Sequence, residues 1–495
     1  MTFYRNPCYP LFVLSQPRQI GNPTEKRIPV KSYLRLLAFC RTRNGARPTL
    51  PCLGPVLVAL VLLAPLIRAQ PPNILFLFSD DQRADTIHAL GNRHIQTPNL
   101  DRLARQGTAF TQAHIMGAMQ GAVCMPSRAM LMSGRTLFRV PDNLKGIDTW
   151  PARFAQSGYR TFITGKWHNG RESLLANFQS GQAVFLGGMS DQFAIQVVDF
   201  SAATGVRNAR TESRFTAELF ADQAIQFLKS SPTSQPFCLY VAFTTPHDPR
   251  SAPPHFKSLY PAGKQRVPSN FLPLHPFNNG EIEVRDEKLL PWPRTPQAVQ
   301  KEIADYYASI TATDAQIGRI LDTLDHSGHA PSTIVVFAGD NGLALGSHGL
   351  LGKQNLYEHS TRVPLIIAGP GVPRNQRNEQ LCYLLDLAPT LCALANIPPP
   401  LGTEGHSLIP TPNTPTPSQR KTLLTAYRDV QRAVTDGSWK LIHYPKINHT
   451  QLFDLTRDPH EIHNLADNPR YTAQRTRMES LLAREQRAFD DPTAR

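Results

Sequence analysis

Short apolar runs separated by amphipathic stretches dominate the middle of the chain. Five runs of strand length are candidates for buried strands, and the first of them is a continuous apolar run, as is typical of a strand buried on both faces. They lie at residues 73–79, 160–164, 237–243, 333–338 and 365–368. Helical spacing of apolar positions instead marks residues 98–107, 213–229 and 299–325, and Thr97 is expected to cap the first of these helices. Strands that alternate with helices predict an α/β domain with a largely parallel sheet.

The pattern changes after the helix expected at residues 386–391. A Pro- and Thr-rich linker is expected at 397–418, and a terminal helix near 470–489. Between them, residues 422–427, 432–444 and 451–455 predict short antiparallel strands, with a turn at Asp436-Gly437. We therefore expect four parts: a leader at 1–70, a catalytic domain at 71–396, the linker, and a C-terminal antiparallel subdomain at 419–495.

Residues 249–296 carry ten prolines and little periodicity. A long irregular segment of this kind in a compact enzyme often lines a substrate cleft. We therefore expect this segment to form a wall of the site.

The first 70 residues have the features of a targeting segment. Arginines at 41, 43 and 47 precede an apolar run at 56–64, which is too short to span a membrane and fits a signal peptide. Cleavage after Ala69 would export the protein to the periplasm or the medium, with no stable membrane span. A buried or amphipathic segment is the alternative. Because the part upstream is long for a signal peptide, we also expect translation to start near residue 40.

Charge and cysteine content narrow the functional classes. Of the formal net charge of +14, the first 70 residues supply +9, from ten Lys and Arg and one acid. The remainder is only mildly basic, which argues against a nucleic-acid groove. The cysteines do not form a disulfide framework at this length, and three of them (Cys8, Cys40 and Cys52) would leave with the leader. We expect Cys238, Cys382 and Cys392 to be buried thiols with at most one bridge.

Cys124 stands in a distinctive run, CMPSR at 124–128, which continues into SGR at 133–135. By itself a lone cysteine is most simply a small buried hydrophobe, or a reactive thiolate at a helix start. The surroundings must decide, because a modified nucleophile for anionic substrates needs a metal and fixed cations.

Two pairs of polar residues follow buried strands. Asp80 and Asp81 come directly after the first strand, and Asp340 and Asn341 follow the strand at 333–338. Loops beyond the carboxyl ends of strands build the active sites of open α/β sheets. Each pair alone suits a turn or a helix cap, but two at strand exits offer four oxygen donors. This set favours Ca²⁺ or Mg²⁺ over zinc.

Further turns supply cations and imidazoles. GKWH at 165–168 closes the strand at 160–164, so Lys166 and His168 would point the same way if the turn is extended. His247 follows the strand at 237–243, and Lys353 lies in a glycine-rich loop after the strand at 333–338. A surface lysine or a packed histidine is the alternative for each of them taken alone.

Together these motifs resemble those of the type I sulfatases, formylglycine-dependent enzymes of the alkaline phosphatase superfamily. The resemblance spans roughly residues 72–465 and includes LFDL at 452–455. It implies an alkaline phosphatase-like α/β fold: a mixed, largely parallel sheet flanked by helices, with a smaller C-terminal domain of antiparallel strands and a helix. It also implies a sulfuric ester hydrolase whose Cys124 is converted to formylglycine by a maturation enzyme. One ion, Ca²⁺ with Mg²⁺ as the alternative, would be held by Asp80, Asp81, residue 124, Asp340 and Asn341.

The resemblance also implies roles for the remaining residues. Lys166 and Lys353 would contact the sulfate, and His247 the sulfate or the leaving group. His168 would take a proton from the formylglycine hydrate. Arg128, one helical turn after residue 124, can hold the hydrate and a carboxylate, and Asp340 is the candidate base. His348 and His359 are expected to support the site.

The resemblance implies a reaction in which one hydroxyl of the hydrate attacks sulfur and the other later expels sulfate. Carbohydrate sulfates are the first expectation for the substrate, and aryl sulfates and choline sulfate stay open. A phosphonate or phosphate ester hydrolase on the same fold is one alternative. A non-catalytic binder of sulfated glycans is another.

Overall fold

The computed structural model describes residues 71–411 and 419–494, and these belong to one compact unit. The expected leader, its cleavage site and its three cysteines lie outside the described residues, as does the end of the expected linker, at 412–418.

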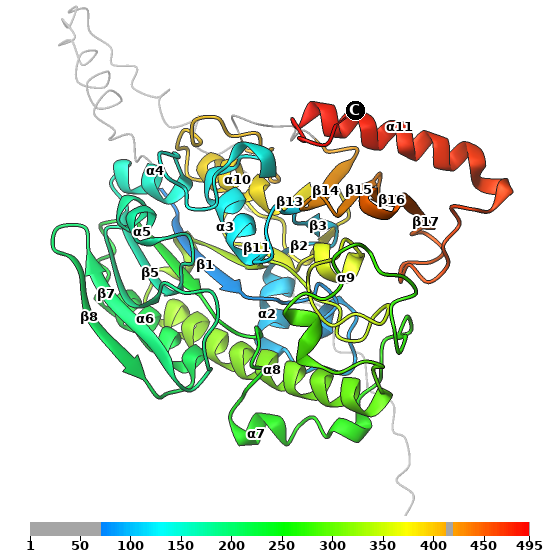
Figure 1. Cartoon of the computed structure of the whole chain (residues 1–495). Helices are drawn as coiled ribbons and strands as arrows, with labels where there is room; N and C mark the ends of the chain where they lie inside the picture. The colour runs from blue at the N-terminus through cyan, green and yellow to red at the C-terminus, as the bar shows by residue number, and fades with distance from the viewer. Residues whose placement is uncertain (1–70, 412–418, 495) are drawn as a thin grey trace, which may run out of the picture. The chain divides into compact units, whose positions relative to one another are not determined.

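A ten-stranded mixed sheet forms the centre of the structure (Figure 1). Five central strands, from β10 to β6, run parallel, and antiparallel neighbours (β11 and β7) flank them. In spatial order the strands are β12 (Gln376–Asn378), β2 (Gly107–Phe110), β11 (Leu365–Ala368), β10 (Thr333–Gly339), β1 (Asn73–Ser79), β9 (Phe237–Ala242), β5 (Arg160–Lys166), β6 (Ser180–Phe185), β7 (Ile195–Ser201) and β8 (Gly205–Glu212). The expected α/β class is confirmed.

Helices cover both faces of this sheet, which is why its central strands are buried at nearly every position (Figure 1). In β1, Ile74, Phe76 and Phe78 face one core, while Leu75 and Leu77 face the other. One face carries α2 (Pro98–Gln106), α6 (Thr216–Ser230) and α8 (Pro296–His326), with α7 (Pro254–Lys257) against α8. The other carries α3 (Cys124–Ser133), α4 (Trp150–Gln156), α5 (Arg171–Asn177) and α10 (Leu387–Leu394).

Two details differ from the sequence expectations. Thr97 makes no capping bond to the backbone of α2; its hydroxyl instead donates to Asp101 and accepts from the amide of His88. Strands β6, β7 and β8, at one end of the sheet, were missed, because they are only partly buried and lack a continuous apolar run.

A second sheet holds most of the C-terminal part. Strands β14 (Leu423–Tyr427), β15 (Gln431–Thr435), β16 (Trp439–Tyr444) and β17 (His449–Asp454) are antiparallel, and α11 (Thr472–Ala488) packs on them. The sheet also includes β4 (Gly117–Ala118), parallel to β14. A side chain at Gly117 would overlap the carbonyl of Ala426, so only glycine permits this close pairing. The C-terminal sheet is thereby fixed to the segment just before Cys124.

Smaller elements complete the fold: β3 (Ala113–His114) pairs with β13 (Cys382–Tyr383), and α9 (Glu358–Thr361) follows the loop after β10. In the part of the chain that the structure describes, no helix is long and apolar enough to cross a membrane. The four described cysteines, Cys124, Cys238, Cys382 and Cys392, are free and buried, as expected for the last three.

Candidate active site

The two polar pairs meet where β1 and β10 end. These strands run parallel with Ser79 opposite Gly339, so the residues that follow lie side by side. The amide of Asp81 donates to Oδ1 of Asp340 at 2.9 Å, and the amide of Asp340 donates to the carbonyl of Ser79 at 3.1 Å. All four polar side chains are buried, as expected for loops at the carboxyl edge of the sheet.

Cys124 is the first residue of α3, and only 2% of it is exposed. Its Sγ lies 3.5 Å from Nζ of Lys166 and 3.5 Å from Nζ of Lys353. Lys166 is the last residue of β5, and Lys353 comes from the loop after β10. A helix N-terminus and two ammonium groups therefore surround the sulfur, an arrangement that stabilises negative charge at this point.

Each of these lysines also pairs with a carboxylate. Nζ of Lys166 lies 2.5 Å from Oδ2 of Asp80, and Nζ of Lys353 lies 2.7 and 2.9 Å from the two oxygens of Asp81. Burial alone would lower the pKa of Lys166, but Asp80 and Cys124 raise it above its ordinary value. Burial would raise the pKa of Asp81, but His247 and Lys353 hold it well below its ordinary range. The Lys166 ammonium and the Asp81 carboxylate are therefore charged.

Arg128 orients Asp340, the acidic member of the second polar pair. Its Nε and Nη2 donate to Oδ2 of Asp340 at 3.0 and 2.9 Å, and its Nη1 donates to the carbonyl of Lys166 at 3.0 Å. The hydroxyl of Ser127 donates to the carbonyl of Asp340 at 2.6 Å. Burial and the neighbouring Asp80 raise the pKa of Asp340 above its ordinary value. The first turn of α3 thus joins the segment around Cys124 to the ends of β10 and β5.

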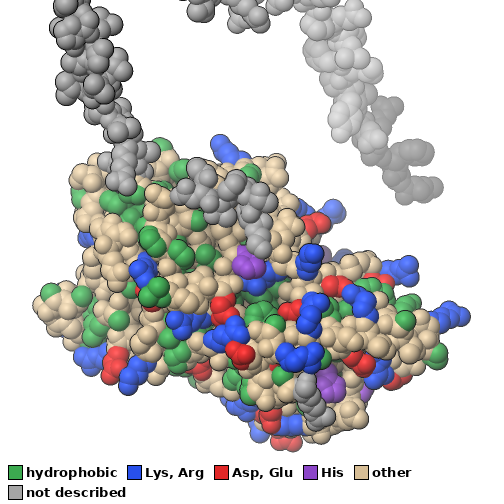
Figure 2. All heavy atoms as spheres, turned by 90° about the horizontal axis from the view of Figure 1, so that it is seen from above, with side chains coloured by type: hydrophobic (Ala, Val, Ile, Leu, Met, Phe, Trp, Pro, Cys, Tyr) green, Lys and Arg blue, Asp and Glu red, His purple; other side chains and the backbone are tan. Residues whose placement is uncertain are grey.

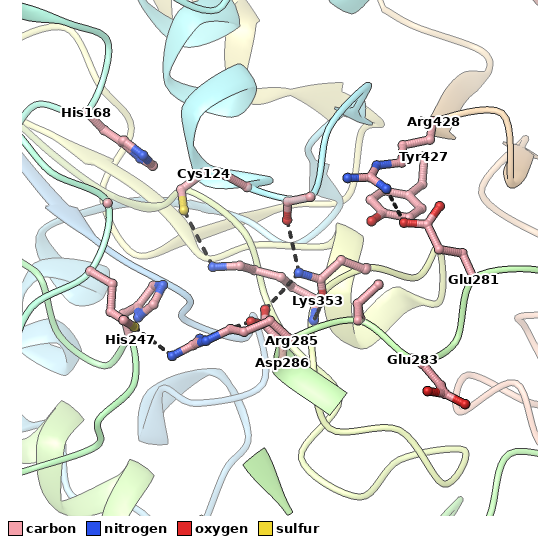
Figure 3. A pocket seen from close by; sticks show the side chains of 16 residues that line it. Cys124, His168, His247, Glu281, Glu283, Arg285, Asp286, Lys353, Tyr427 and Arg428 are labelled. Carbon is pink, nitrogen blue, oxygen red and sulfur yellow. Dashed lines mark hydrogen bonds and ion pairs between the residues drawn. The ribbon is translucent and has the colours of Figure 1, made fainter. Parts of the chain in front are cut away.

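His168 and His247 stand near the sulfur on the cavity side (Figure 3). His168 has a φ of 71°, so the turn after Lys166 is not extended as supposed, although both side chains still reach the site. Burial lowers the pKa of His168 to about 2, and Lys166 and Arg128 act in the same direction, so the imidazole is neutral. His247 places Nε2 3.7 Å from Oδ2 of Asp81, and its Nδ1 is 2.7 Å from the carbonyl of Asp248.

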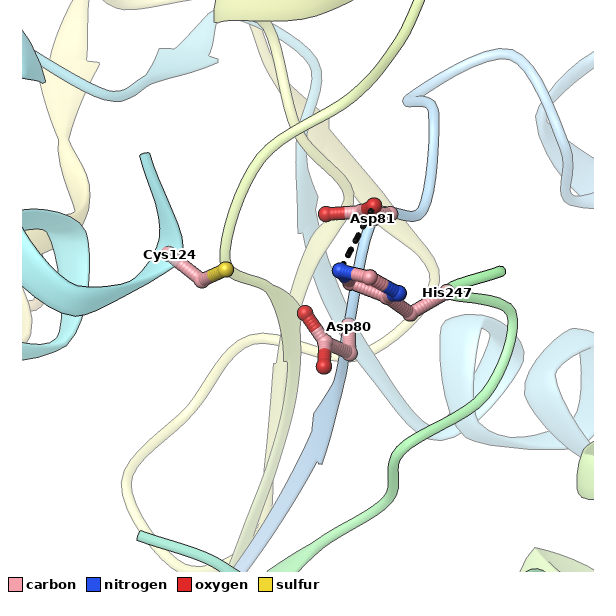
Figure 4. Close-up of side chains that lie close together, drawn as sticks. All are labelled: Asp80, Asp81, Cys124 and His247. Carbon is pink, nitrogen blue, oxygen red and sulfur yellow. Dashed lines mark ion pairs between the residues drawn. The ribbon is translucent and has the colours of Figure 1, made fainter. Parts of the chain in front are cut away.

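The residues present fit a bound cation. Ligand atoms of Asp80, Asp81, Cys124 and His247 lie within 4.8 Å of one another (Figure 4). Among the described residues, Oδ1 of Asp80 and Oδ1 of Asn341 are buried oxygens without a hydrogen-bond partner. Buried acceptors are almost always paired. Two unpaired oxygens beside two further carboxylates are therefore well explained by a hard cation.

A cavity of about 550 Å³ opens above this group (Figure 3). Cys124, His168, His247 and Lys353 line it, whereas the other predicted site residues lie buried beneath: Asp80, Asp81, Arg128, Lys166, Asp340 and Asn341. The irregular segment 249–296 forms part of the wall, as expected. The sequence did not identify the individual lining residues of this segment, nor those at the end of β14. They are Glu281, Glu283, Val284, Arg285, Asp286, Tyr427 and Arg428.

His348 and His359 lie outside the lining of this cavity. His348 stacks on Tyr357 with 3.9 Å between ring centroids, and its Nε2 donates to the carbonyl of Glu461 at 2.9 Å. Nε2 of His359 lies 3.3 Å from Nδ1 of His348. The contact of His348 with Glu461 joins the loop after β10 to the C-terminal part of the chain.

The face drawn in Figure 2 carries Lys and Arg interspersed with Asp and Glu. A continuous basic stripe of the kind used for nucleic acid is not visible among the described residues on this face.

Comparison with known proteins identifies the family. The family model Sulfatase matches residues 72–397, and the model N-sulphoglucosamine sulphohydrolase, C-terminal, matches residues 346–488. The N-acetylglucosamine-6-O-sulfatase of Bacteroides thetaiotaomicron is 26% identical over 500 residues, covering 86% of this chain and 88% of that protein. The chain belongs to the sulfatase family and is a sulfuric ester hydrolase.

Solved structures show the same fold. One, a complex with its substrate D-glucosamine-2-N,6-O-disulfate, has a TM-score of 0.71 and 23% identity, covering 86% of this chain and 99% of that one. The phosphonate monoester hydrolase of Agrobacterium radiobacter has a TM-score of 0.67 and 20% identity, covering 84% and 96%. Since the fold is shared across both ester types, the site must define the reaction.

Proposed function

We propose that this protein hydrolyses sulfate esters of carbohydrates with a formylglycine made from Cys124 and one bound divalent cation. The main support is the position of Cys124 at the start of α3, at the base of the cavity, with Lys166 and Lys353 each 3.5 Å from its sulfur. A sulfate ester is a tetrahedral anion, and fixed cations around it stabilise the charge that develops during transfer.

The cation would be held by Asp80, Asp81, Asn341, Asp340 and residue 124. Ca²⁺ is the proposed ion and Mg²⁺ the alternative, because the donors other than residue 124 are oxygens. His247 also lies within reach and is a further candidate ligand. When bound, the cation would polarise the sulfate and favour the ionised nucleophile.

The chain's own residues would then divide the proton transfers and the charge. Lys166 and Lys353 face the sulfate oxygens, and Arg128 holds Asp340 as the base for the attacking hydroxyl of the hydrate. That attack forms the S–O bond to residue 124 and breaks the bond to the alcohol, which takes its proton from Lys353 or His247. Neutral His168 then accepts the proton of the second hydroxyl, so the aldehyde re-forms as sulfate leaves. Water restores the hydrate.

A carbohydrate leaving group is supported by the size of the cavity and by the relatives. About 550 Å³ is within the range of small-molecule sites, and the relatives described above act on or bind sulfated glucosamines. We propose that residues 1–70 direct export, and that an oxidising maturation enzyme of the host converts Cys124.

Phosphonate or phosphate ester hydrolysis is the second candidate, because the phosphonate monoester hydrolase shares the fold. Initial rates with phenyl sulfate, phenyl phosphate and phenyl phenylphosphonate would separate the two. Preference for the sulfate supports the proposal, and preference for either phosphorus ester contradicts it.

Mass spectrometry of the peptide that contains residue 124 tests the nucleophile. We expect the mass of formylglycine in active preparations, and loss of turnover in Cys124→Ala with unchanged folding. An unmodified thiol together with tight binding of sulfated sugars would instead indicate a non-catalytic binder. Full activity of Cys124→Ala would contradict the proposed nucleophile.

A further inference from the structure

The C-terminal sheet contributes one side of the cavity. Tyr427, the last residue of β14, and Arg428 line it together with Glu281 from the irregular segment. Figure 3 shows Tyr427 and Arg428 on the side opposite His168 and His247, with Cys124 between them. A substrate whose sulfate reaches Cys124 therefore has room to extend its alcohol part toward Tyr427.

The backbone holds this wall in a fixed position relative to the nucleophile. Tyr427 pairs with Ala118 of β4, and the amide of Arg428 donates to the carbonyl of Ala118 at 2.8 Å. Ala118 lies six residues before Cys124 in the sequence. Arg428 itself has a φ of 44°, a conformation that costs energy for a residue with a side chain. The turn at Arg428 is therefore held by the pairing of β14 with β4, and not by the backbone preference of arginine.

The polar side chains around Tyr427 have hydrogen-bond or ion-pair partners, with one exception. Arg428 forms an ion pair with Glu281, and the amide nitrogen of Gln354 donates to Gly121 and Asp286. The exception is the hydroxyl of Tyr427, which has no hydrogen-bond partner among the described residues. It is buried, since only 2% of the residue is exposed.

Among the described residues that line the cavity, His168 is the other one with a buried, unpartnered polar atom. The proposed function already gives His168 a role in proton transfer. Buried hydroxyls are normally satisfied, so the unpartnered phenol at the opposite wall indicates a polar group of a ligand. Because burial also raises the pKa of Tyr427, its hydroxyl stays protonated and can donate.

We propose that the Tyr427 hydroxyl hydrogen-bonds a hydroxyl or amide group of the substrate's alcohol part, making Tyr427 a specificity-determining residue for polyhydroxylated leaving groups. This inference rests on the proposed function and goes further by naming the group that selects the leaving group. A site built around such a bond disfavours an analogue that lacks the partner, because the buried phenol is then left unpaired.

The test compares wild type with Tyr427→Phe on two substrates, N-acetylglucosamine 6-sulfate and phenyl sulfate. The second has a leaving group with no hydroxyl or amide beyond the ester oxygen. We expect kcat/KM for the sugar sulfate to fall about tenfold to a hundredfold in the variant, the cost of losing one buried hydrogen bond. For phenyl sulfate we expect a change of less than about twofold, because the ring of the phenylalanine keeps the apolar contact.

Tyr383→Phe is the matched control. Its hydroxyl is also buried, but it is paired with the carbonyl and the amide of Leu424 at 2.7 and 2.6 Å. Removing it should lower Tm and change both substrates alike, whereas Tyr427→Phe should leave Tm nearly unchanged. An unchanged kcat/KM for the sugar sulfate in Tyr427→Phe, or an equal fall for both substrates, overturns the inference.

A separate measurement keeps the inference testable if the wild type hydrolyses neither ester, the result that contradicts the proposed function. Calorimetric titration with N-acetylglucosamine 6-sulfate then compares the two proteins. Weaker binding by Tyr427→Phe supports recognition by the phenol. Equal binding, or no binding by the wild type, refutes it.

Discussion

Arg128 directs two of its nitrogens at one oxygen of Asp340: Nε and Nη2 lie 3.0 and 2.9 Å from Oδ2. The other oxygen of Asp340 is left to accept from the amide of Asp81. One guanidinium therefore sets the orientation of a carboxylate that joins both strand ends, and it does so in a buried environment where a lysine cannot reproduce the fork.

Arg128→Lys is expected to lower kcat/KM for phenyl sulfate by about a hundredfold, because Asp340 loses the two guanidinium hydrogen bonds that orient it. Arg432→Lys is the matched control, since Arg432 forms two equally buried hydrogen bonds to Asp491, at 2.6 and 2.9 Å, and does not itself line the cavity. Urea unfolding should show both variants destabilised, by up to about 3 kcal/mol. Activity should fall in Arg128→Lys only; equal activities of the two variants would argue against a positioning role.

Removal of divalent cations is expected to abolish activity and lower Tm. The unpaired Oδ1 atoms of Asp80 and Asn341, beside the carboxylate of Asp81, are buried acceptors that a cation would satisfy. At a calcium concentration a hundred times Kd, binding should add about 2.7 kcal/mol to the free energy of unfolding. Calorimetry of the EDTA-treated protein, with Ca²⁺ or Mg²⁺ added back, measures this. Activity that persists after verified metal removal contradicts the cation site.

Gly188→Ala is expected to impair catalysis without unfolding the protein. A Cβ at position 188 would lie 2.6 Å from Nε2 of His168, so the imidazole must move. Its Nδ1 has no partner among the described residues to restrain it. A displacement of about 1 Å can cost up to a hundredfold in rate.

Gly263→Ala serves as the control for this prediction, because the added Cβ meets nothing within 4 Å. Both variants should keep a nearly unchanged Tm, and only Gly188→Ala should lose kcat. If the two variants show the same kcat, the position of His168 does not limit the reaction.

Stability is expected to fall as the pH drops from 6.5 toward 4. Burial lowers the pKa of His275 and of His348 from 6.5 to about 4, although hydrogen bonds to backbone carbonyls act in the opposite direction. In this window the unfolded chain binds protons that the folded protein does not, so acid favours unfolding. Each histidine should account for about 2 kcal/mol between pH 7.5 and pH 5.

His275→Asn tests this pH dependence, because an asparagine amide can replace the bond from Nδ1 to the carbonyl of His348 without titrating. Urea unfolding at pH 7.5 and pH 5 should show a smaller loss of stability in the variant than in the wild type. Loss of the packing of the imidazole ring would lower the free energy of unfolding equally at pH 7.5 and pH 5, so it would not affect the difference between them. A loss of stability equal to that of the wild type would show that His275 already binds a proton in the folded state.

The sequence identified the parts of the fold that follow from local rules. The strand at 73–79 is β1 to the residue, because a fully buried strand needs an unbroken apolar run. Partly buried strands such as β7 carry no such signal, and Leu365–Ala368 reads as a strand whose antiparallel direction the pattern does not reveal. Strand direction depends on which neighbours it meets, and that is a property of the whole chain.

The same division holds for the site. Cys124, Asp80, Asp81, Asp340 and Asn341 are recognisable in the sequence because their motifs directly follow strands or open a helix. The partners of each charge are not: the sequence does not show that Lys353 pairs with Asp81, or that Tyr427 reaches the cavity. Residues 124 and 427 are brought to one cavity by the pairing of β4 with β14, across about three hundred residues of chain. Such pairings arise from packing of distant elements, so the motif around Cys124 is written locally, while the side chains that share its cavity are decided by the tertiary structure.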